Sequence, residues 1–190
     1  DPNADLPVMF YMTGRGANEN GIAGQEGTLY GQLFAQGYGF NGFNGIVVIP
    51  LSAGKSTEIT DSHINDINGI CDEIKQQYPN ADTKNMGLVG FSDGATRAYQ
   101  VANADKLNHG NHHFDSVLMI DRAEEYSSED DEAFKKNNIH LGVYYSNVYG
   151  AECQNIHAAE FNEQIANDHA GALRESCSQD TIKWLYRNRE

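Results

Sequence analysis

The chain has 190 residues, enough for one domain with a substantial core and too few for two ordinary ones, so we expect a single domain over 1–190. Hydrophobic residues make up 39% and charged residues 21%, which is typical of a globular protein, and no apolar run approaches the roughly 18 residues of a membrane span. The formal net charge of −14 would repel phosphate backbones and anionic lipid, so we expect neither nucleic-acid binding nor membrane insertion.

Along the chain, short apolar runs alternate with amphipathic stretches. Strands are predicted at 6–12, 44–50, 86–91, 114–120 and 139–146. Helices are predicted near 27–36, 62–78, 94–104, 129–137, 157–167 and 179–188. This alternation predicts an α/β fold with three layers, in which helices cover both faces of a mostly parallel sheet of five to six strands. Ligands of such sheets meet the carboxyl ends of the strands, so function is expected in the segments 13–21, 51–61, 92–95, 121–127 and 147–156.

The three cysteines bear on structure and on location. Cys71 lies on the apolar side of a helical pattern and is expected to be a buried thiol. Cys153 and Cys177 lie in loop-like sequence, and we expect a disulfide between them if the protein is secreted. This bridge, the acidity and the clipped-looking start of the sequence favour an extracellular location. No C-x-x-C spacing occurs, and no metal site is predicted.

The stretch 85–100 reads NMGLVGFSDGATRAYQ and places Ser92 in the pattern G-x-S-x-G, after a predicted strand and before a predicted helix. A nucleophile on such a tight turn adopts a strained backbone that projects its hydroxyl clear of the main chain. Strand and helix then pass so close that Gly90 and Gly94 must lack side chains. The turn also points the helix N-terminus and the Asp93 backbone N–H at the site, which suits a developing oxyanion. An ordinary glycine-rich turn is the alternative, and the position of the pattern favours a nucleophile.

With this turn in place, the chain resembles the α/β-hydrolase family over nearly its whole length, and within it the small, lidless bacterial lipases and esterases. In that family, a glycine-containing turn after the first strand completes the oxyanion hole. The sequence MTGRG at 12–16 matches this place, although Thr13 stands where the family usually has histidine. The resemblance implies that the backbone N–H groups of Arg15 and Asp93 form the oxyanion hole.

A serine hydroxyl needs a base to take its proton, and in this family a histidine near the C-terminus does so. Of the seven histidines, His169 stands before a short loop and a final amphipathic helix, like the base of the small bacterial lipases. We therefore predict His169 as the base, with His157 as the alternative.

Two carboxylates compete to orient the base. The family usually places the acid after the strand at 139–146, where Glu152 is the only carboxylate of the loop. A bridge between Cys153 and Cys177 would bring Glu152 within reach of His169, so Glu152 is favoured. The alternative is Asp121, which ends the run SVLMID one strand earlier, a position that some members of the fold use.

The sequence SAGKST at 52–57 resembles the end of a phosphate-binding loop. The first glycine of that motif would fall on Ile49, so the cradle of N–H groups is missing. Lys55 is therefore expected at the rim of the site or in solvent.

These residues predict a serine hydrolase that acts on a carboxylic ester through an acyl-enzyme, without metal or organic cofactor. The loops expected around the site are polar, which favours a small or polar acyl ester, such as an acylated carbohydrate, as the small-molecule substrate. A serine peptidase or thioesterase with the same triad is the alternative within the enzyme class. A non-catalytic binding module on the hydrolase scaffold is the alternative outside it. The oligomeric state stays open.

Overall fold

The computed structural model of the chain describes residues 5–15, 43–50, 58–104, 107 and 112–187. The helix predicted near 27–36 and the segment 51–57, with Lys55, lie outside these residues. Among the described helices, none is both long and apolar enough to cross a bilayer.

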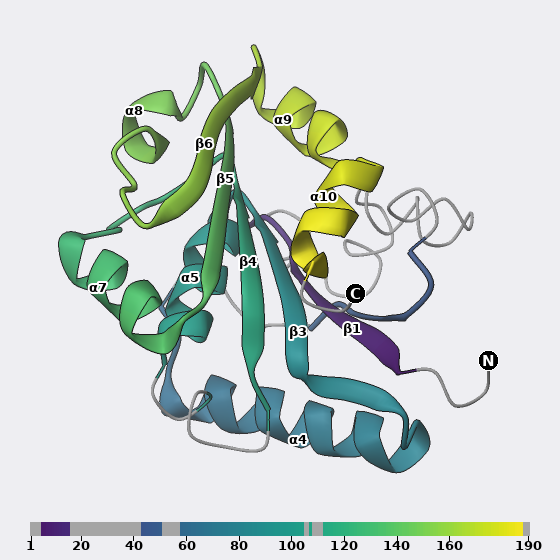
Figure 1. Cartoon of the computed structure of the whole chain (residues 1–190). Coiled ribbons are helices and arrows are strands. Elements are labelled where there is room, and N and C mark those ends of the chain that lie inside the picture. The colour runs from purple at the N-terminus through teal and green to yellow at the C-terminus, as the bar shows by residue number, and fades with distance from the viewer. Residues whose placement is uncertain (1–4, 16–42, 51–57, 105–106, 108–111, 188–190) are drawn as a thin grey trace.

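Within the described ranges, six parallel strands form one sheet in the order β2-β1-β3-β4-β5-β6 (Figure 1). The strands are β1 Leu6–Met12, β2 Ile46–Val48, β3 Ala81–Phe91, β4 Phe114–Ile120, β5 His140–Ser146 and β6 Ala159–Ala166. The helices are α4 Asp61–Gln77, α5 Asp93–Asn103, α7 Ser128–Asn137, α8 Gly150–Cys153, α9 His169–Ser176 and α10 Gln179–Leu185. All five strands predicted from the sequence are confirmed within a few residues.

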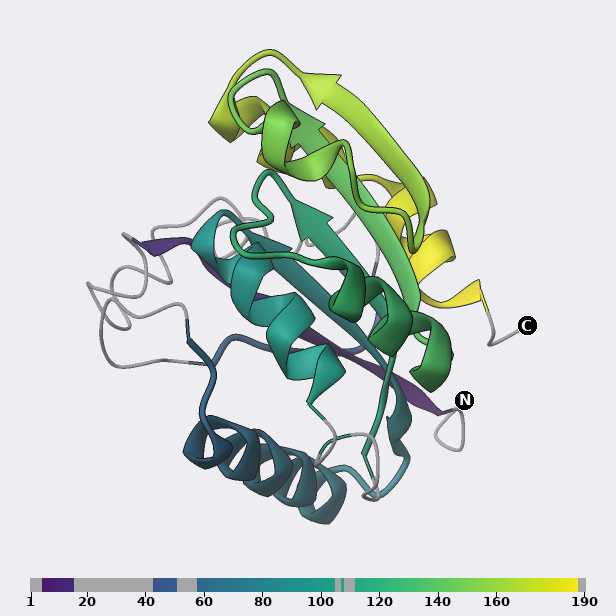
Figure 2. The same ribbon diagram turned by 90° about the vertical axis from the view of Figure 1, so that its left-hand side faces the viewer.

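Two hydrophobic cores lie on the two faces of this sheet, because alternate residues of a strand point to opposite sides. On β1, Val8, Phe10 and Met12 belong to the core that includes α4, α5 and α7, whereas Met9 and Tyr11 belong to the core that includes α9 and α10. Figure 2 shows α4, α5, α7 and α8 on one side of the sheet and α9 and α10 behind it. The predicted three-layer α/β architecture is confirmed.

The C-terminal third corrects two predictions. The segment predicted as a helix at 157–167 is the edge strand β6 (Ala159–Ala166). Its residues Ala, Glu and Gln favour helix locally, but the strand pairs with β5, and the Phe161 ring packs over Gly142 and against Trp184. Tertiary contacts therefore override local propensity. The segment expected as a loop after His169 is the helix α9, which Asp168 caps by accepting a hydrogen bond from the Gly171 backbone N–H.

All three cysteines are free thiols, so the expected bridge between Cys153 and Cys177 is wrong. Cys153 is buried in the core that includes α4, α5 and α7, whereas Cys177 packs with the core of α9 and α10, across the sheet. The Cys177 thiol donates a hydrogen bond to the Leu173 carbonyl oxygen instead. Cys71 is buried, as predicted, and burial raises its pKa to about 12.

Candidate active site

Ser92 stands at the turn between β3 and α5 with φ 56° and ψ −129°. A positive φ is costly for any residue other than glycine, and such strain clusters at functional positions. The turn is held because the Ser92 N–H donates to the Ile120 carbonyl oxygen (2.9 Å) and the Ala95 N–H donates to the Ser92 carbonyl oxygen (2.8 Å). The side chain of Ser92 is half-buried rather than enclosed.

The two glycines that flank Ser92 are required by close approach. A Cβ on Gly90 would lie 2.7 Å from the Ala95 Cα, and a Cβ on Gly94 would lie 2.7 Å from the Thr13 carbonyl oxygen. Neither position has room for a methyl group, since both sets of neighbouring atoms belong to backbone. The crossing of strand and helix predicted from the pattern G-x-S-x-G is present.

The chain after β1 passes directly against this turn. A Cβ built on Gly14 would lie 3.3 Å from the Ser92 Cβ, so the main chain at Gly14 and the serine are nearly in contact. Beside it, Arg97 donates from its NH1 to the Thr13 carbonyl oxygen (3.5 Å). Arg15 and Asp93, the two residues predicted to supply backbone N–H groups, therefore flank Ser92. Asp93 is the first residue of α5, where backbone N–H groups have no partner within the helix.

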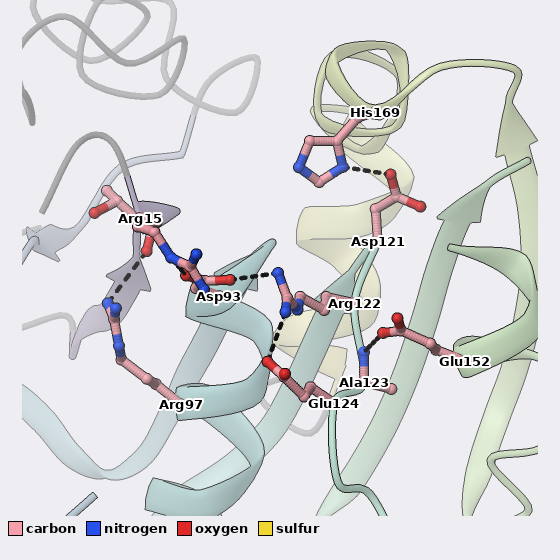
Figure 3. Close-up of polar contacts among 10 residues, drawn as sticks. Arg15, Asp93, Arg97, Asp121, Arg122, Ala123, Glu124, Glu152 and His169 are labelled. Carbon is pink, nitrogen blue, oxygen red and sulfur yellow. Dashed lines mark hydrogen bonds and ion pairs between the residues drawn. The ribbon is translucent and has the colours of Figure 1, made fainter. Parts of the chain in front are cut away.

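His169 begins α9 and reaches the end of β4. Its Nδ1 lies 2.6 Å from the Asp121 Oδ2, as Figure 3 shows. An ionised carboxylate only accepts hydrogen bonds, so in a neutral imidazole paired with one, Nδ1 carries the proton and Nε2 has the free lone pair. The imidazole is about one-third exposed (33%), whereas Asp121 is fully buried.

Two aromatic rings fix the plane of this imidazole. Phe91, the residue before Ser92, stacks on the His169 ring with centroids 4.5 Å apart. Tyr149 packs against the same ring at a tilted angle, with centroids 4.9 Å apart. The stacking on Phe91 therefore brings the His169 ring to the neighbourhood of the serine turn.

Asp121, the alternative acid, contacts His169 in the structure, and Glu152 does not. Glu152 is exposed on α8, and its Oε2 accepts a hydrogen bond from the Ala123 backbone N–H (3.4 Å) (Figure 3). The disulfide that was expected to bring Glu152 within reach of His169 does not form. The expectation that Glu152 orients the imidazole is therefore not met in this geometry.

Ser146 is a residue of the site that the sequence did not single out. At the end of β5, its backbone N–H donates to the Asp121 Oδ1 (2.6 Å) and its hydroxyl group donates to the Asp121 Oδ2 (2.7 Å). Asp121 itself has φ 57°, a second strained position at a strand end. The signal available in the sequence was its position, since Ser146 ends the strand after which the family usually places the acid.

Beside Ser92, the Asp93 carboxylate lies between two arginines. Its Oδ2 pairs with the Arg15 Nε and its Oδ1 with the Arg122 NH1, each at 2.6 Å. Arg122 also pairs with Glu124, and these carboxylates raise the pKa of its guanidinium despite the opposing effect of burial. Burial lowers the pKa of Arg97, and the charge of Asp93 opposes that shift.

The other predicted residues lie elsewhere. His157, the alternative base, is exposed and stands just before β6 begins, at the opposite end of the strands from Ser92. Across the part of the chain that the structure describes, no group of three or more histidine, cysteine or acidic side chains is arranged to hold a metal ion.

Solved structures with the same arrangement of elements are esterases and related hydrolases. A thermostable esterase superposes with a TM-score of 0.67 over 98% of this chain and 56% of its own, at 15% sequence identity. An esterase of Pyrococcus furiosus gives 0.58 over 98% of this chain and 84% of its own, at 12% identity. The acylaminoacyl peptidase of Pyrococcus horikoshii gives 0.51 over 98% of this chain and 37% of its own, at 13% identity.

These similarities define the fold. The chain has the α/β-hydrolase fold, and it spans 56% of the length of the first of these esterases. No protein-family model matches the sequence, and no curated protein matches it.

Proposed function

We propose that the protein is a serine hydrolase that cleaves carboxylic esters with Ser92 as nucleophile, His169 as base and Asp121 as the acid. The observation that carries this proposal is the strained Ser92 turn beside an imidazole whose Nδ1 is bound to a buried carboxylate. This is the arrangement that activates a serine hydroxyl group. The esterases among the structural neighbours support the class of reaction.

In the proposed reaction, the Ser92 oxygen attacks the ester carbonyl carbon while the His169 Nε2 takes the hydroxyl proton. The backbone N–H groups of Arg15 and Asp93 hold the oxyanion of the tetrahedral intermediate. Collapse breaks the bond to the alcohol, which leaves with the proton from His169. Water, deprotonated by the same nitrogen, then attacks the acyl-enzyme and releases the acid and the free serine.

A small or polar acyl ester, such as an acylated carbohydrate, is the proposed substrate. The site residues described here are largely polar or charged, with Arg15, Asp93 and Arg122 next to the nucleophile. A panel of p-nitrophenyl esters of increasing acyl length, together with acetylated sugars, tests this part. Peptide and thioester substrates in the same panel test the alternative reactions of the same residues.

Labelling with a fluorophosphonate tests the nucleophile. The wild-type protein should gain the mass of one phosphonyl group, and Ser92→Ala should gain none. Ser62→Ala, which changes an exposed serine of α4, is the matched control and should label like the wild type. Labelling that persists in Ser92→Ala would mean that another residue is the reactive nucleophile. Labelling that is missing from the wild type at high reagent would favour a binding module that has kept the scaffold.

A further inference from the structure

The Asp93 carboxylate joins three strand ends. It is 1% exposed, and it pairs with Arg15 from the chain after β1 and with Arg122 from the chain after β4, while its own residue begins α5 after β3. Figure 3 shows the carboxylate between the two guanidinium groups. Burying an ionised carboxylate is unfavourable unless it is paired and hydrogen-bonded, so these two partners are what allows the charge at this position.

The tight turn at Ser92 does not itself require this charge. The turn needs small residues on both flanks, which Gly90 and Gly94 supply, and any side chain fits the pattern at position 93. What the carboxylate adds is a direct link between Arg15 and Asp93, the two residues whose backbone N–H groups form the proposed oxyanion hole. The link is 2.6 Å long, between the Arg15 Nε and the Asp93 Oδ2.

The link between Arg15 and Asp93 matters because the segment just before Arg15 is not part of the sheet. Thr13 and Gly14 lie outside any helix or strand, so hydrogen bonds of the sheet do not fix their height above Ser92. Contacts that hold this segment among the described residues include Arg97 on the Thr13 carbonyl oxygen, Gly14 against the Ser92 side chain, and Asp93 on the Arg15 guanidinium. Only the last of these acts on Arg15 itself.

We infer that Asp93 is a positioning residue of the oxyanion hole, and that it acts by holding Arg15 so that the two backbone N–H groups converge on one oxygen atom. This inference rests on the proposed function. Oxyanion stabilisation depends on donors that are in place before charge develops. A displaced Arg15 N–H therefore lowers the stabilisation of the transition state more than the affinity for the substrate.

Arg15→Met tests the inference, because it removes the guanidinium group and leaves the backbone N–H in place. Arg15 is about half exposed (53%), so the variant should fold. We expect kcat for a p-nitrophenyl ester to fall by about 10-fold to 100-fold, at or below the roughly 100-fold cost of losing or misplacing one oxyanion donor, while KM changes by less than about 3-fold. The inhibition constant of a trifluoromethyl ketone, whose hemiketal with Ser92 carries an oxyanion, should rise by the same factor as kcat falls.

Two further variants separate positioning from general damage. Arg15→Lys restores a cation that can reach Asp93 and should recover most of the lost kcat. Arg187→Met breaks a matched arginine–carboxylate pair with Glu160 (2.9 Å), which joins the end of α10 to the edge strand β6, and should leave kcat and the inhibition constant unchanged. The pH midpoint of kcat/KM should be the same in all three variants, because the link between His169 and Asp121 is intact in each.

The inference is overturned if Arg15→Met folds and keeps both kcat and the inhibition constant within about twofold of the wild type, while Ser92 still reacts with fluorophosphonate. It is also overturned if KM rises and kcat stays constant, since Arg15 would then bind substrate rather than position a donor. Failure of the wild type to label at all would instead refute the proposed function, and this inference with it.

Discussion

The ends of β3 and β4 each place a buried aspartate beside the serine, and the two differ in their partners. Asp93 follows the end of β3 and meets the guanidinium groups of Arg15 and Arg122. Asp121 follows β4 and meets the imidazole of His169 and the hydroxyl group of Ser146. Both carboxylates are essentially inaccessible to solvent.

Because burial is equal, the partner determines what each carboxylate can do. Arginine stays protonated at any pH a protein survives, so the pairs at Asp93 hold fixed charges and can only fix positions. Imidazole gains and loses a proton near neutral pH, so Asp121 can stabilise a charge that comes and goes during a reaction. In the proposed reaction, Asp93 therefore has a structural role and Asp121 supports proton transfer.

The largest effect is expected where the carboxylate of Asp121 is neutralised. Asp121→Asn replaces an acceptor with an amide that can present N–H to the imidazole, which favours the wrong tautomer of His169. We expect kcat to fall by about 10³-fold to 10⁴-fold, the size seen when a triad aspartate is amidated, with little change in KM. Steady-state kinetics on a p-nitrophenyl ester measure it.

Glu152→Gln is the matched control, since it makes the same chemical change on the exposed α8. It should leave kcat within about twofold of the wild type, as expected for a surface change that touches no substrate. The reverse pattern, with Glu152→Gln inactive and Asp121→Asn active, would show that the loop after β5 carries the acid after all.

A smaller effect is expected at Ser146, which hydrogen-bonds to Asp121 rather than to the imidazole. Ser146→Ala removes the hydroxyl hydrogen bond to Oδ2 and keeps the backbone N–H bond to Oδ1. A hydrogen bond from a hydroxyl group to a charged carboxylate contributes about 1.5–3 kcal/mol, so we expect kcat to fall by at most about 10-fold to 150-fold.

Ser116→Ala on β4 provides the comparison, because Ser116 is also fully buried and its hydroxyl group has no hydrogen-bond partner among the residues that the structure describes. Both variants should be similarly folded by circular dichroism, and only Ser146→Ala should lose activity. Equal losses in the two variants would mean that repacking of the sheet, rather than the orientation of Asp121, limits the rate.

The structure at the end of β3 could be predicted from the sequence. The turn at Ser92 is encoded locally, since Gly90 and Gly94 are needed within four residues of each other and the apolar run before them defines the strand. The alternation of strands and helices defined the sheet for the same reason. His169 was found by its position before the final helices, although it begins α9 rather than a loop.

The structure at the end of β4 depends on contacts between distant residues, and these contacts could not be predicted from the sequence. Asp121 and His169 are 48 residues apart, and nothing local distinguishes Asp121 from Glu152 as the partner. The helix predicted at 157–167 became β6 because its pairing with β5 and the packing of Phe161 are tertiary effects. The false disulfide had the same origin, since the two cysteines lie on opposite faces of the sheet.

The smallest effect is expected at Glu160, an exposed counterpart of Asp93. Glu160 on β6 accepts hydrogen bonds from His140 and Trp184 and pairs with Arg187, yet its side chain is 42% exposed. Burial raises its pKa, but the hydrogen bonds and the charge of Arg187 outweigh that effect, so the pKa lies below its ordinary value. Solvent screening limits the contribution of such a pair, so Glu160→Gln should lower the free energy of unfolding at pH 7 by less than about 1 kcal/mol.

The pH dependence of that loss tests the electrostatic part of the comparison. A carboxylate whose pKa is lowered by folding stabilises the native state above its unfolded pKa, near the ordinary value of 4.5, and loses that contribution as the pH falls through the folded pKa. The difference in unfolding free energy between wild type and Glu160→Gln, measured by urea denaturation, should therefore shrink as the pH falls below 4.5. Activity at pH 7 should stay unchanged. A difference that persists at lower pH would show that the packing of Trp184, and not the charge of Glu160, holds this edge of the sheet.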